Sequence, residues 1–323
     1  MKIPRRHFLH LATGVAALPA FPAIARGQAY PARPVHIIVG FPPGGSADIT
    51  ARLIGQSLSA RAGQQFVVEA RPGAATNIAT EAVARAAPDG YTLLLVTQTN
   101  AVNPSLYKNL SFDFVRDIAP VASVLRIAGV MVVNSSFPAT TVPAFSAYAK
   151  ANPGKINMGS GGNGSAQHLY GELFKIMAGI DMVHVPYRGQ PLNDLLGGRL
   201  QVVFNPIPST IEFIRAGKLR ALAVTSATRQ DVLPDIPAVA EFVPGYEASG
   251  WFGIGAPKDT LAEIIGKLNR EINAAIADPK MKTKFSDLGA TVLTGSPADF
   301  RKLIADETKK WGKVVKVARI TLG

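Results

Sequence analysis

Two glycine-rich loops contain the residues of this chain that are best suited to binding chemistry. The first covers residues 41–48 (FPPGGSAD), and the second covers residues 159–168 (GSGGNGSAQH). Glycines let backbone N–H groups approach a ligand closely, and a loop that opens a helix adds unpaired donors and the positive end of the helix dipole. Both loops also contain serine hydroxyl groups. These features suit the binding of an anionic group, and of a carboxylate in particular.

Each loop lies between a predicted strand and a predicted helix. An apolar strand at 35–39 precedes the first loop, and a short strand at 156–158 precedes the second. Because ligands of open α/β sheets sit outside the carboxyl ends of the strands, both loops can face one cleft. Two opposed helix N-termini would then suit a small molecule with a carboxylate at each end. Either loop alone could also be no more than a tight turn.

The second loop also fits a different kind of ligand. Gly159, Gly161 and Gly164 match the dinucleotide-binding pattern G-x-G-x-x-G, and Asp181 lies about 20 residues further on, where a ribose-binding acid belongs. This pattern keeps an exported NAD(P)-dependent oxidoreductase open as the alternative function. Against it, the preceding strand is short, and the pattern lies in the middle of the chain rather than in a first βαβ unit.

Nucleophilic catalysis and metal binding find little support in the sequence. The chain contains no G-x-S-x-G motif and no cysteine, which argues against an α/β-hydrolase and against thiolate chemistry. Ser165 and His168 would lie one helical turn apart, but a triad needs a third orienting group. His36 and His184 lie in apolar strands, where a histidine is more often a core group than a ligand. We therefore expect a binding protein rather than an enzyme, with no metal and no cofactor.

Composition and charge restrict the class of protein further. Of the 323 residues, 47% are hydrophobic and 17% are charged, so a wholly disordered polymer is excluded. The formal net charge of +12 favours anionic partners through long-range attraction. Cations accumulate between Arg301 and Arg319, but aromatic residues make up only 7% of the chain. Because Trp311 is the only aromatic residue between these cations, this segment indicates a solvated helix face, and no nucleic-acid partner is expected.

The first 25 residues have the features of an export signal. Lys2, Arg5 and Arg6 precede an apolar stretch that ends at Ile24, and residues 23–25 (AIA) offer the small-x-small pattern of a cleavage site. The adjacent arginines are typical of the twin-arginine route, although an ordinary secretory signal also stays open. No later stretch approaches the ~18–20 apolar residues of a spanning helix. We expect a soluble mature protein in a periplasm.

Strands and helices alternate along the rest of the chain, which predicts parallel sheets covered by helices. Two apolar stretches, 118–133 and 251–255, interrupt the alternation and are expected to cross between two lobes. The predicted fold class is therefore α/β, with two lobes, two crossing strands and a ligand cleft between the lobes. Lobe 1 is predicted at 30–127 plus 252–323, and lobe 2 at 128–251. The other predicted strands are 66–68, 91–96, 182–185, 202–204, 219–224 and 291–293, and the predicted helices are 46–62, 77–87, 165–178, 192–196, 207–216, 260–277, 279–288 and 296–317.

Seven short motifs, spread in order over the mature chain, carry a family resemblance. They are FPPGG at 41–45, RPGA at 71–74, APDGY at 87–91, VNPSLY at 102–107, GSAQHL at 164–169, VPYRG at 185–189 and RAGKLRAL at 215–222. This series resembles the Bug-type substrate-binding proteins of tripartite tricarboxylate transporters. The resemblance implies a periplasmic binding protein of the type II-like class that closes on a small organic carboxylate. It also implies a membrane permease as the partner, and we expect the protein to be a monomer.

The resemblance implies roles for particular residues in both lobes. In the first lobe it implies an apolar wall formed by Phe41 and polar contacts after the third strand from Gln98 and Thr99. It also implies a loop of hydrogen-bond donors, braced by an acidic residue: the donors are Gly44, Gly45 and Ser46, and the acid is Asp48. In the second lobe it implies that Tyr187 and Asn205 contact the far end of the ligand and that His168 supports the loop that binds the carboxylate. The residues of that loop are Ser160, Gly162, Asn163, Gly164 and Ser165.

Several positions depart from the family's usual pattern. Ala70 stands where an Asn usually precedes Arg-Pro-Gly, and Ala75-Thr76 stands where Gly-Gly is usual. Asn205 occupies a place where aspartate is frequent. An acid there would attract a ligand amine and repel a second carboxylate, whereas Asn205 can both donate and accept hydrogen bonds. We therefore expect a ligand without an ammonium group, such as a dicarboxylate or an aromatic carboxylate.

Overall fold

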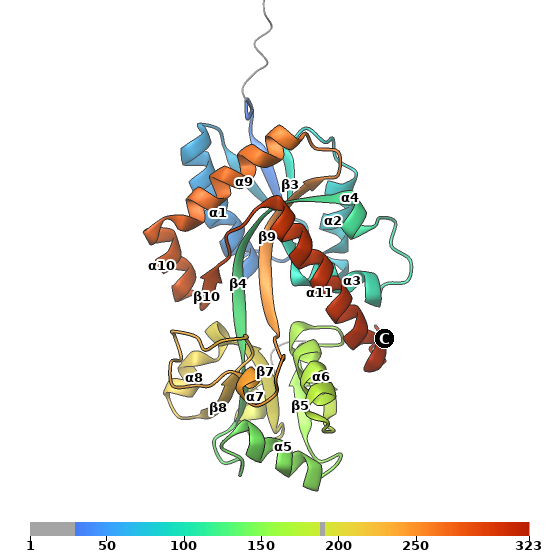
Figure 1. Cartoon of the computed structure of the whole chain (residues 1–323), viewed down its shortest axis with the longest axis vertical. Coiled ribbons are helices and arrows are strands. Elements are labelled where there is room, and N and C mark those ends of the chain that lie inside the picture. Colours follow the sequence, from blue (N-terminus) through green and yellow to red (C-terminus); the bar gives the residue numbers. More distant parts are fainter. Residues whose placement is uncertain (1–29, 188–190, 323) are drawn as a thin grey trace, which may run out of the picture.

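Two long strands connect the two parts of the molecule (Figure 1). The computed structural model describes residues 30–187 and 191–322. Strand β4 (Ile118–Asn134) runs from one part into the other, as the apolar stretch at 118–133 predicts. Strand β9 (Ser249–Pro257) pairs antiparallel with β4 from Ile118 to Ala128. The fold is therefore α/β with two lobes, and each lobe adds its own strands to one part of β4.

The first lobe contains a sheet in the order β2-β1-β3-β9-β4, with β10 paired to β4. Strands β1, β2 and β3 are parallel, so their carboxyl ends lie at one edge of the sheet. Their near-continuous apolar sequences fit strands that are covered by helices on both faces. The bounds are β1 (Val35–Val39), β2 (Phe66–Ala70), β3 (Thr92–Thr97), β10 (Ala290–Val292), α1 (Ser46–Ala62), η1 (Ala74–Thr76), α2 (Asn77–Ala84), α3 (Gln98–Leu106), α4 (Phe114–Asp117), α9 (Ala262–Ala277) and α10 (Pro279–Asp287).

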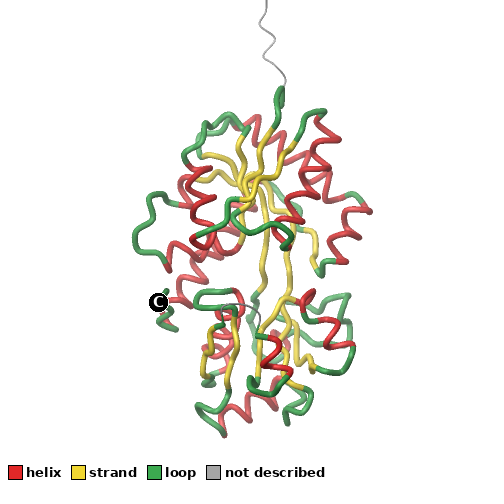
Figure 2. The backbone as a smooth tube through the Cα atoms, turned by 180° about the vertical axis from the view of Figure 1, so that it is seen from behind, coloured by secondary structure: helices red, strands yellow, loops and turns green. Residues whose placement is uncertain are grey.

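The second lobe continues from β4 through β7, β5 and β6, with β8 also paired to β4. Strands β5, β6 and β7 are parallel to one another, and β7 and β8 run antiparallel to β4. Figure 2 shows the strands of each lobe surrounded by helices and loops. The bounds are β5 (Asn157–Ser160), β6 (Val183–Pro186), β7 (Val202–Pro206), β8 (Leu219–Val224), α5 (Val142–Ala151), α6 (Ala166–Ala178), α7 (Leu192–Leu196), η2 (Ile207–Ser209), α8 (Ile211–Arg215) and η3 (Val239–Glu241).

The last helix, α11 (Pro297–Val317), packs against both lobes. Phe300 and Ile304, near its start, belong to a core cluster of the first lobe that also contains Trp251. Trp311 and Val314, near its end, belong to the core cluster of the second lobe. Figure 1 shows this helix descending from the first lobe to the side of α6. The C-terminal helix thus contributes to two cores.

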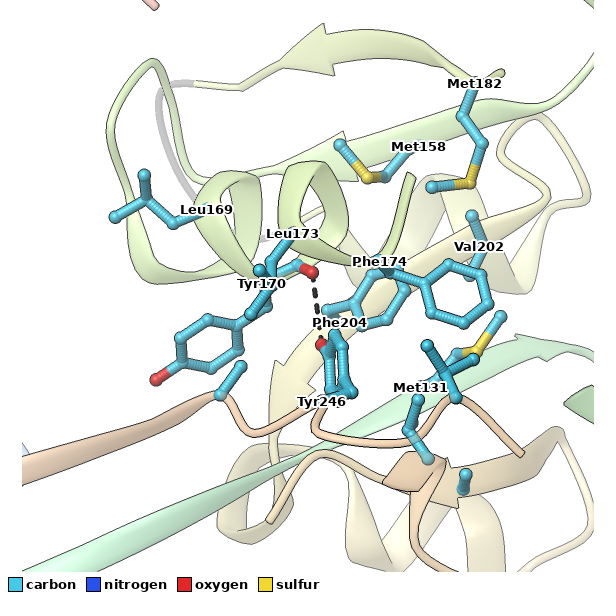
Figure 3. Packing of buried hydrophobic residues seen from close by; sticks show 14 of the residues in the cluster. Met131, Met158, Leu169, Tyr170, Leu173, Phe174, Met182, Val202, Phe204 and Tyr246 are labelled. Atoms are coloured by element: carbon cyan, nitrogen blue, oxygen red, sulfur yellow. Dashed lines mark hydrogen bonds between the residues drawn. The ribbon is translucent and has the colours of Figure 1, made fainter. Parts of the chain in front are cut away.

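Aromatic rings fill the core of the second lobe beneath α6. Phe174 packs against Phe204 and Tyr246, with ring centroids 5.6 Å and 6.1 Å away (Figure 3). The hydroxyl group of Tyr246 donates a hydrogen bond of 3.1 Å to the backbone carbonyl of Tyr170, which Figure 3 marks with a dashed line. These contacts fix the position of α6, whose first turn faces the other lobe.

Most predicted elements are confirmed, with informative differences at helix boundaries. Helix α1 begins directly after its N-cap residue Gly45, as the predicted range 46–62 requires. Helix α2 ends at Ala84, three residues earlier than predicted. The predicted helix at 207–216 is divided, because its first turn is the 3₁₀ turn η2 and α8 follows after a break. Helices α3, α4 and α5 were not predicted.

The export signal predicted at 1–25 lies outside the described residues. Within the described ranges, no helix combines the length and the apolar character that crossing a membrane requires. The numerical boundaries of the two lobes stay a prediction.

Candidate ligand-binding site

A cavity of about 470 Å³ lies between the two lobes, beside the connecting strands. Its walls come from the loop after β1, the start of α3, the middle of β4, the start of α6 and the η2 turn. No charged side chain is among the described residues that line it. The lining residues are Phe41, Gly45, Ser46, Thr97, Gln98, Thr99, Ile127, Ala128, Gly129, Ala166, Tyr170, Pro206, Pro208, Ser209, Gly250 and Phe252.

Three helices begin at the wall of this cavity. Gly45 and Ser46 mark the start of α1, Gln98 starts α3, and Ala166 starts α6. The first hydrogen bond inside α1 runs from the Ile49 N–H to the Gly45 carbonyl, so the N–H groups just before it have no acceptor within the helix. The three helix starts together present donors and positive dipole ends to an anion, without a cationic side chain.

Asp48 holds the first loop from inside. Its carboxylate is buried, accepts a 3.0 Å hydrogen bond from the Gly44 N–H, and accepts a 2.9 Å bond from Nε of Arg52. The hydrogen bond from Arg52 holds the pKa of Asp48 below its usual value, so the carboxylate stays ionised. Asp48 therefore braces the first loop through Gly44, and its charge is matched by Arg52 rather than presented to the cavity.

Gln98 carries an amide donor that has no hydrogen-bond partner among the described residues. The hydroxyl group of Tyr170 donates a 3.1 Å hydrogen bond to Oε1 of Gln98, which orients the amide. Nε2 of Gln98 is buried and makes no hydrogen bond with any described residue. Burial raises the pKa of Tyr170 well above its usual value, so the hydroxyl keeps its proton and remains a donor. Gln98 also lines the cavity, so this unpaired amide donor belongs to the cavity wall.

Most polar groups of the second glycine loop form hydrogen bonds within the loop or with neighbouring residues of the second lobe. The Ser160 hydroxyl lies 2.6 Å from Nε2 of His184, and the Gly162 N–H donates to that hydroxyl at 3.1 Å. The Gly161 N–H donates to Oε1 of Gln167, and Ser165 caps α6. Ser160, Gly162, Asn163, Gly164 and Ser165 are not among the residues that line the cavity, whereas the next residue, Ala166, is.

His168 lies in a different hollow from the inter-lobe cavity. This hollow has a volume of about 300 Å³ and is also lined by His184, Glu172 and the C-terminal segment 318–321. The imidazole rings of His168 and His184 stack with centroids 3.5 Å apart. Nδ1 of His168 accepts a 3.2 Å hydrogen bond from the Gly164 N–H, so His168 supports the second loop. Asn163 also faces this side, where its Nδ2 donates to the Thr321 carbonyl at 3.1 Å.

Tyr187 and Asn205 lie behind the cavity wall. The Tyr187 hydroxyl donates a 2.6 Å hydrogen bond to Asp194, away from the lining residues. Asn205 is completely buried, and its Nδ2 donates to Ser209 at 2.9 Å and to Thr210 at 2.6 Å. Asn205 is therefore engaged with the η2 turn, and of its contacts only Ser209 lines the cavity.

Most of the chain, residues 50–320, matches the family model described as "Tripartite tricarboxylate transporter family receptor". The chain belongs to this receptor family. It is 39% identical to Protein BugT of Bordetella pertussis over 292 residues, which cover 89% of this chain and 90% of that protein. The receptor also matches solved structures: R. palustris Rpa4515 with adipate (37% identity, TM-score 0.78, 91% of this chain and 100% of that chain) and periplasmic binding protein BugD (33% identity, TM-score 0.74, 91% and 100%).

A third solved relative of the receptor is MatC of Rhodopseudomonas palustris with bound malate, at 29% identity and a TM-score of 0.74, covering 88% of this chain and 100% of that chain. These relatives are binding proteins, and the receptor shares their two-lobe fold. The comparisons thus confirm the family that the seven sequence motifs indicated.

Two of the three glycines that match the dinucleotide pattern have packing roles in the receptor. A Cβ atom on Gly159 would lie 2.4 Å from Cδ1 of Leu200, so a larger residue does not fit there. Gly164 has a φ of +74° and lies against Leu106. Asp181 is exposed and lies 3.8 Å from Lys175. These contacts account for Gly159 and Gly164 without a nucleotide.

Several lining residues were missed by sequence reasoning. They are Tyr170 in helix α6, Ile127 and Phe252 in the two crossing strands, Pro206 at the end of β7 and Pro208 in η2, and their sequence positions are typical of core or turn residues. No local pattern distinguishes them, because their contact with the cavity depends on how the two lobes are placed. The one available signal was the pair of crossing strands, which must pass the floor of any cleft between the lobes.

Proposed function

We propose that this receptor captures a small organic carboxylate in the inter-lobe cavity and delivers it to a membrane permease of the tripartite type. The observation that carries the proposal is the convergence of helix N-termini and the unpaired Gln98 amide on an uncharged cavity. A carboxylate accepts several hydrogen bonds at once, and bonds to an ionised acceptor are stronger than neutral ones. The adipate and malate bound to two solved relatives support the same ligand class.

Binding requires no side-chain cation in this arrangement. The start of α1 supplies backbone N–H groups, and Thr99 and Ser46 supply hydroxyl groups beside Gln98. When the lobes close, exclusion of water lowers the local dielectric constant and strengthens these interactions. The closed form would present a surface composed of both lobes to the permease. Capture followed by delivery, without turnover of the ligand, fits this chemistry.

The proposal includes export and assembly. The segment 1–25 would direct the protein to the periplasm, through the twin-arginine route, and be removed there. The mature protein would act as a monomer, with one lobe formed by 30–127 plus 252–323 and the other by 128–251. The route is tested by replacing Arg5 and Arg6 with lysine and fractionating the cells, which should abolish export by the twin-arginine route. The route would be refuted if mature protein were found in the periplasm of cells that lack the twin-arginine translocase.

Two measurements test ligand capture. Protein purified from its host is denatured, and the released small molecules are identified by mass spectrometry; an organic acid supports the proposal, and a dinucleotide overturns it. Isothermal titration then compares Gln98→Leu with Gln56→Leu, which changes an exposed glutamine on α1. We expect at least a tenfold loss of carboxylate affinity in Gln98→Leu, or about 1.4 kcal/mol, and no loss in the control.

A further inference from the structure

One side of the cavity is apolar. Phe41, Ile127 and Phe252 line the cavity and also pack against a single core cluster of the first lobe. Phe41 and Phe252 are partly exposed, and neither ring packs against another aromatic ring among the described residues. Part of each ring is therefore open to a ligand in the cavity. Flat apolar groups pack well against such faces through offset or edge-to-face contacts.

The second lobe closes the same side with prolines. Pro208 lies against Gly289, where a Cβ atom would meet the Pro208 ring at 3.0 Å. The next residue, Ala290, belongs to the core cluster against which Phe41 packs. Pro206 and Pro208 both line the cavity, and proline has no N–H group to donate. This side of the cavity thus offers carbon surface from both lobes.

The remaining side-chain donors gather at one place. The Ser209 hydroxyl donates to the Pro206 carbonyl at 3.0 Å, and the Tyr170 hydroxyl is engaged with Gln98. Among the described lining residues, this leaves Nε2 of Gln98 and the hydroxyl groups of Ser46 and Thr99. All three belong to the first turns of α1 and α3.

These two helix starts form a single anchor. Helices α1 and α3 follow β1 and β3, which are neighbouring parallel strands of the sheet. Neighbouring strands lie about 4.8 Å apart, which is a distance that one carboxylate group can span. A second carboxylate directed at the side formed by Phe252 and Pro208 would meet no described side chain that carries a charge or a spare donor. Burial of an ionised group without partners is strongly unfavourable.

We infer that the ligand of this receptor is a monocarboxylate with a flat apolar body, held by the starts of α1 and α3 and packed against Phe41 and Phe252. The inference rests on the proposed function of the same cavity and names its substrate class. It narrows the expectation from the sequence, in which a dicarboxylate and an aromatic carboxylate were equally acceptable.

A matched set of four probes tests the inference by isothermal titration on ligand-free mature protein. The probes are 4-methylbenzoate, terephthalate, adipate and 4-methylbenzamide. Terephthalate adds a second carboxylate to the same ring, and the amide removes the charge. We expect 4-methylbenzoate to bind at least tenfold more tightly than either dicarboxylate, and the amide to show no saturable binding.

The outcomes separate the two levels of the argument. A dicarboxylate that binds within tenfold of 4-methylbenzoate, or more tightly, overturns the monocarboxylate class and leaves carboxylate capture standing. The amide binding as well as the carboxylate, or none of the three carboxylates binding, overturns both.

A pair of variants tests the apolar side. Phe41→Leu removes the aromatic face from a partly exposed loop residue, and Phe242→Leu makes the same change at an exposed position that does not line the cavity. We expect Phe41→Leu to weaken 4-methylbenzoate binding about fivefold and acetate binding less than twofold. Phe242→Leu leaves both unchanged. Unchanged affinity of Phe41→Leu for 4-methylbenzoate overturns the assigned packing.

Discussion

The hydroxyl group of Tyr170 lies 3.1 Å from Oε1 of Gln98 and joins helix α6 of the second lobe to the start of α3 in the first. The tyrosine itself is fixed by its ring, which stacks on Trp311 with centroids 5.8 Å apart, and by its carbonyl, which accepts from Tyr246. One hydrogen bond thus orients the unpaired Gln98 donor and ties it to the position of the other lobe.

Tyr170→Phe tests this relationship. Loss of the hydroxyl frees the Gln98 amide to rotate, so we expect carboxylate affinity to fall three- to tenfold. The lost hydrogen bond lowers the free energy of unfolding by about 1 kcal/mol. Tyr148→Phe is the control, since the Tyr148 hydroxyl makes no hydrogen bond among the described residues. Equal affinities of the two variants would show that the Gln98 orientation does not depend on Tyr170.

Glu307 supports both tryptophans beside the connecting strands. Its Oε2 accepts hydrogen bonds from Nε1 of Trp251 at 3.1 Å and from Nε1 of Trp311 at 2.7 Å, and its Oε1 lies 2.5 Å from Nζ of Lys310. Glu307→Ala leaves two buried N–H groups unsatisfied and removes one of the two carboxylates that pair with Lys310, so we expect a loss of about 3 kcal/mol in urea unfolding.

A matched variant distinguishes burial from charge in that experiment. Glu212→Ala removes an exposed partner of Arg215 and should change the free energy of unfolding by less than about 0.5 kcal/mol. Similar losses in the two variants would contradict the role assigned to Glu307.

The stacked histidines predict a pH dependence of stability. Burial and the neighbouring His168 lower the pKa of His184 from 6.5 to about 4. Between these values the unfolded chain binds the proton more readily than the folded chain, so stability falls as the pH falls from 6.5 to 4. We expect the Tm of His184→Gln to vary less over this range than that of the natural protein. A steeper profile for the variant would refute the assignment.

A substitution of Gly159 tests whether this glycine is required for packing rather than for a dinucleotide-binding pattern. Gly159→Ala places a Cβ atom 2.4 Å from Leu200 and 2.9 Å from Pro191, and overpacking of this kind costs about 1–3 kcal/mol. Gly266→Ala, inside helix α9, meets nothing closer than 3.6 Å and should stabilise by about 0.5–1 kcal/mol. Thermal unfolding measures both. A fully stable Gly159→Ala protein would mean that the glycine is present for another reason.

The sequence predicted the elements whose patterns are local. An apolar strand followed by a Gly-Gly turn and an amphipathic run gave β1, the first loop and α1. Helix α3 escaped prediction because its sequence, QTNAVNPSL, is polar and contains Pro104. It is stabilised by tertiary hydrogen bonds, such as those from Nδ2 of Asn100 to Thr76 and Thr80. The periodicity of apolar residues in the sequence gives no indication of such a hydrogen-bond network.

The sequence also treated the two glycine loops as equals, and the structure distinguishes them. The first loop uses the Gly44 N–H on Asp48 and places Gly45 and Ser46 at the cavity wall, whereas in the second loop Ser160, Gly161 and Gly162 bond to one another, to His184 and to Gln167. Residue types alone give the number of donors in a loop. Whether those donors are already used depends on neighbours from β6 and α6, which only the folded chain brings together.

Because α11 is embedded at its start in one core and at its end in the other, the lobes cannot swing apart around β4 and β9 alone. Any wider opening has to bend this helix or pull Trp311 and Val314 out of their packing. The angle between the lobes is therefore limited by the C-terminal helix, and with it the rate at which a captured molecule can escape. Residence time in this protein would be set partly by a segment that never touches the ligand.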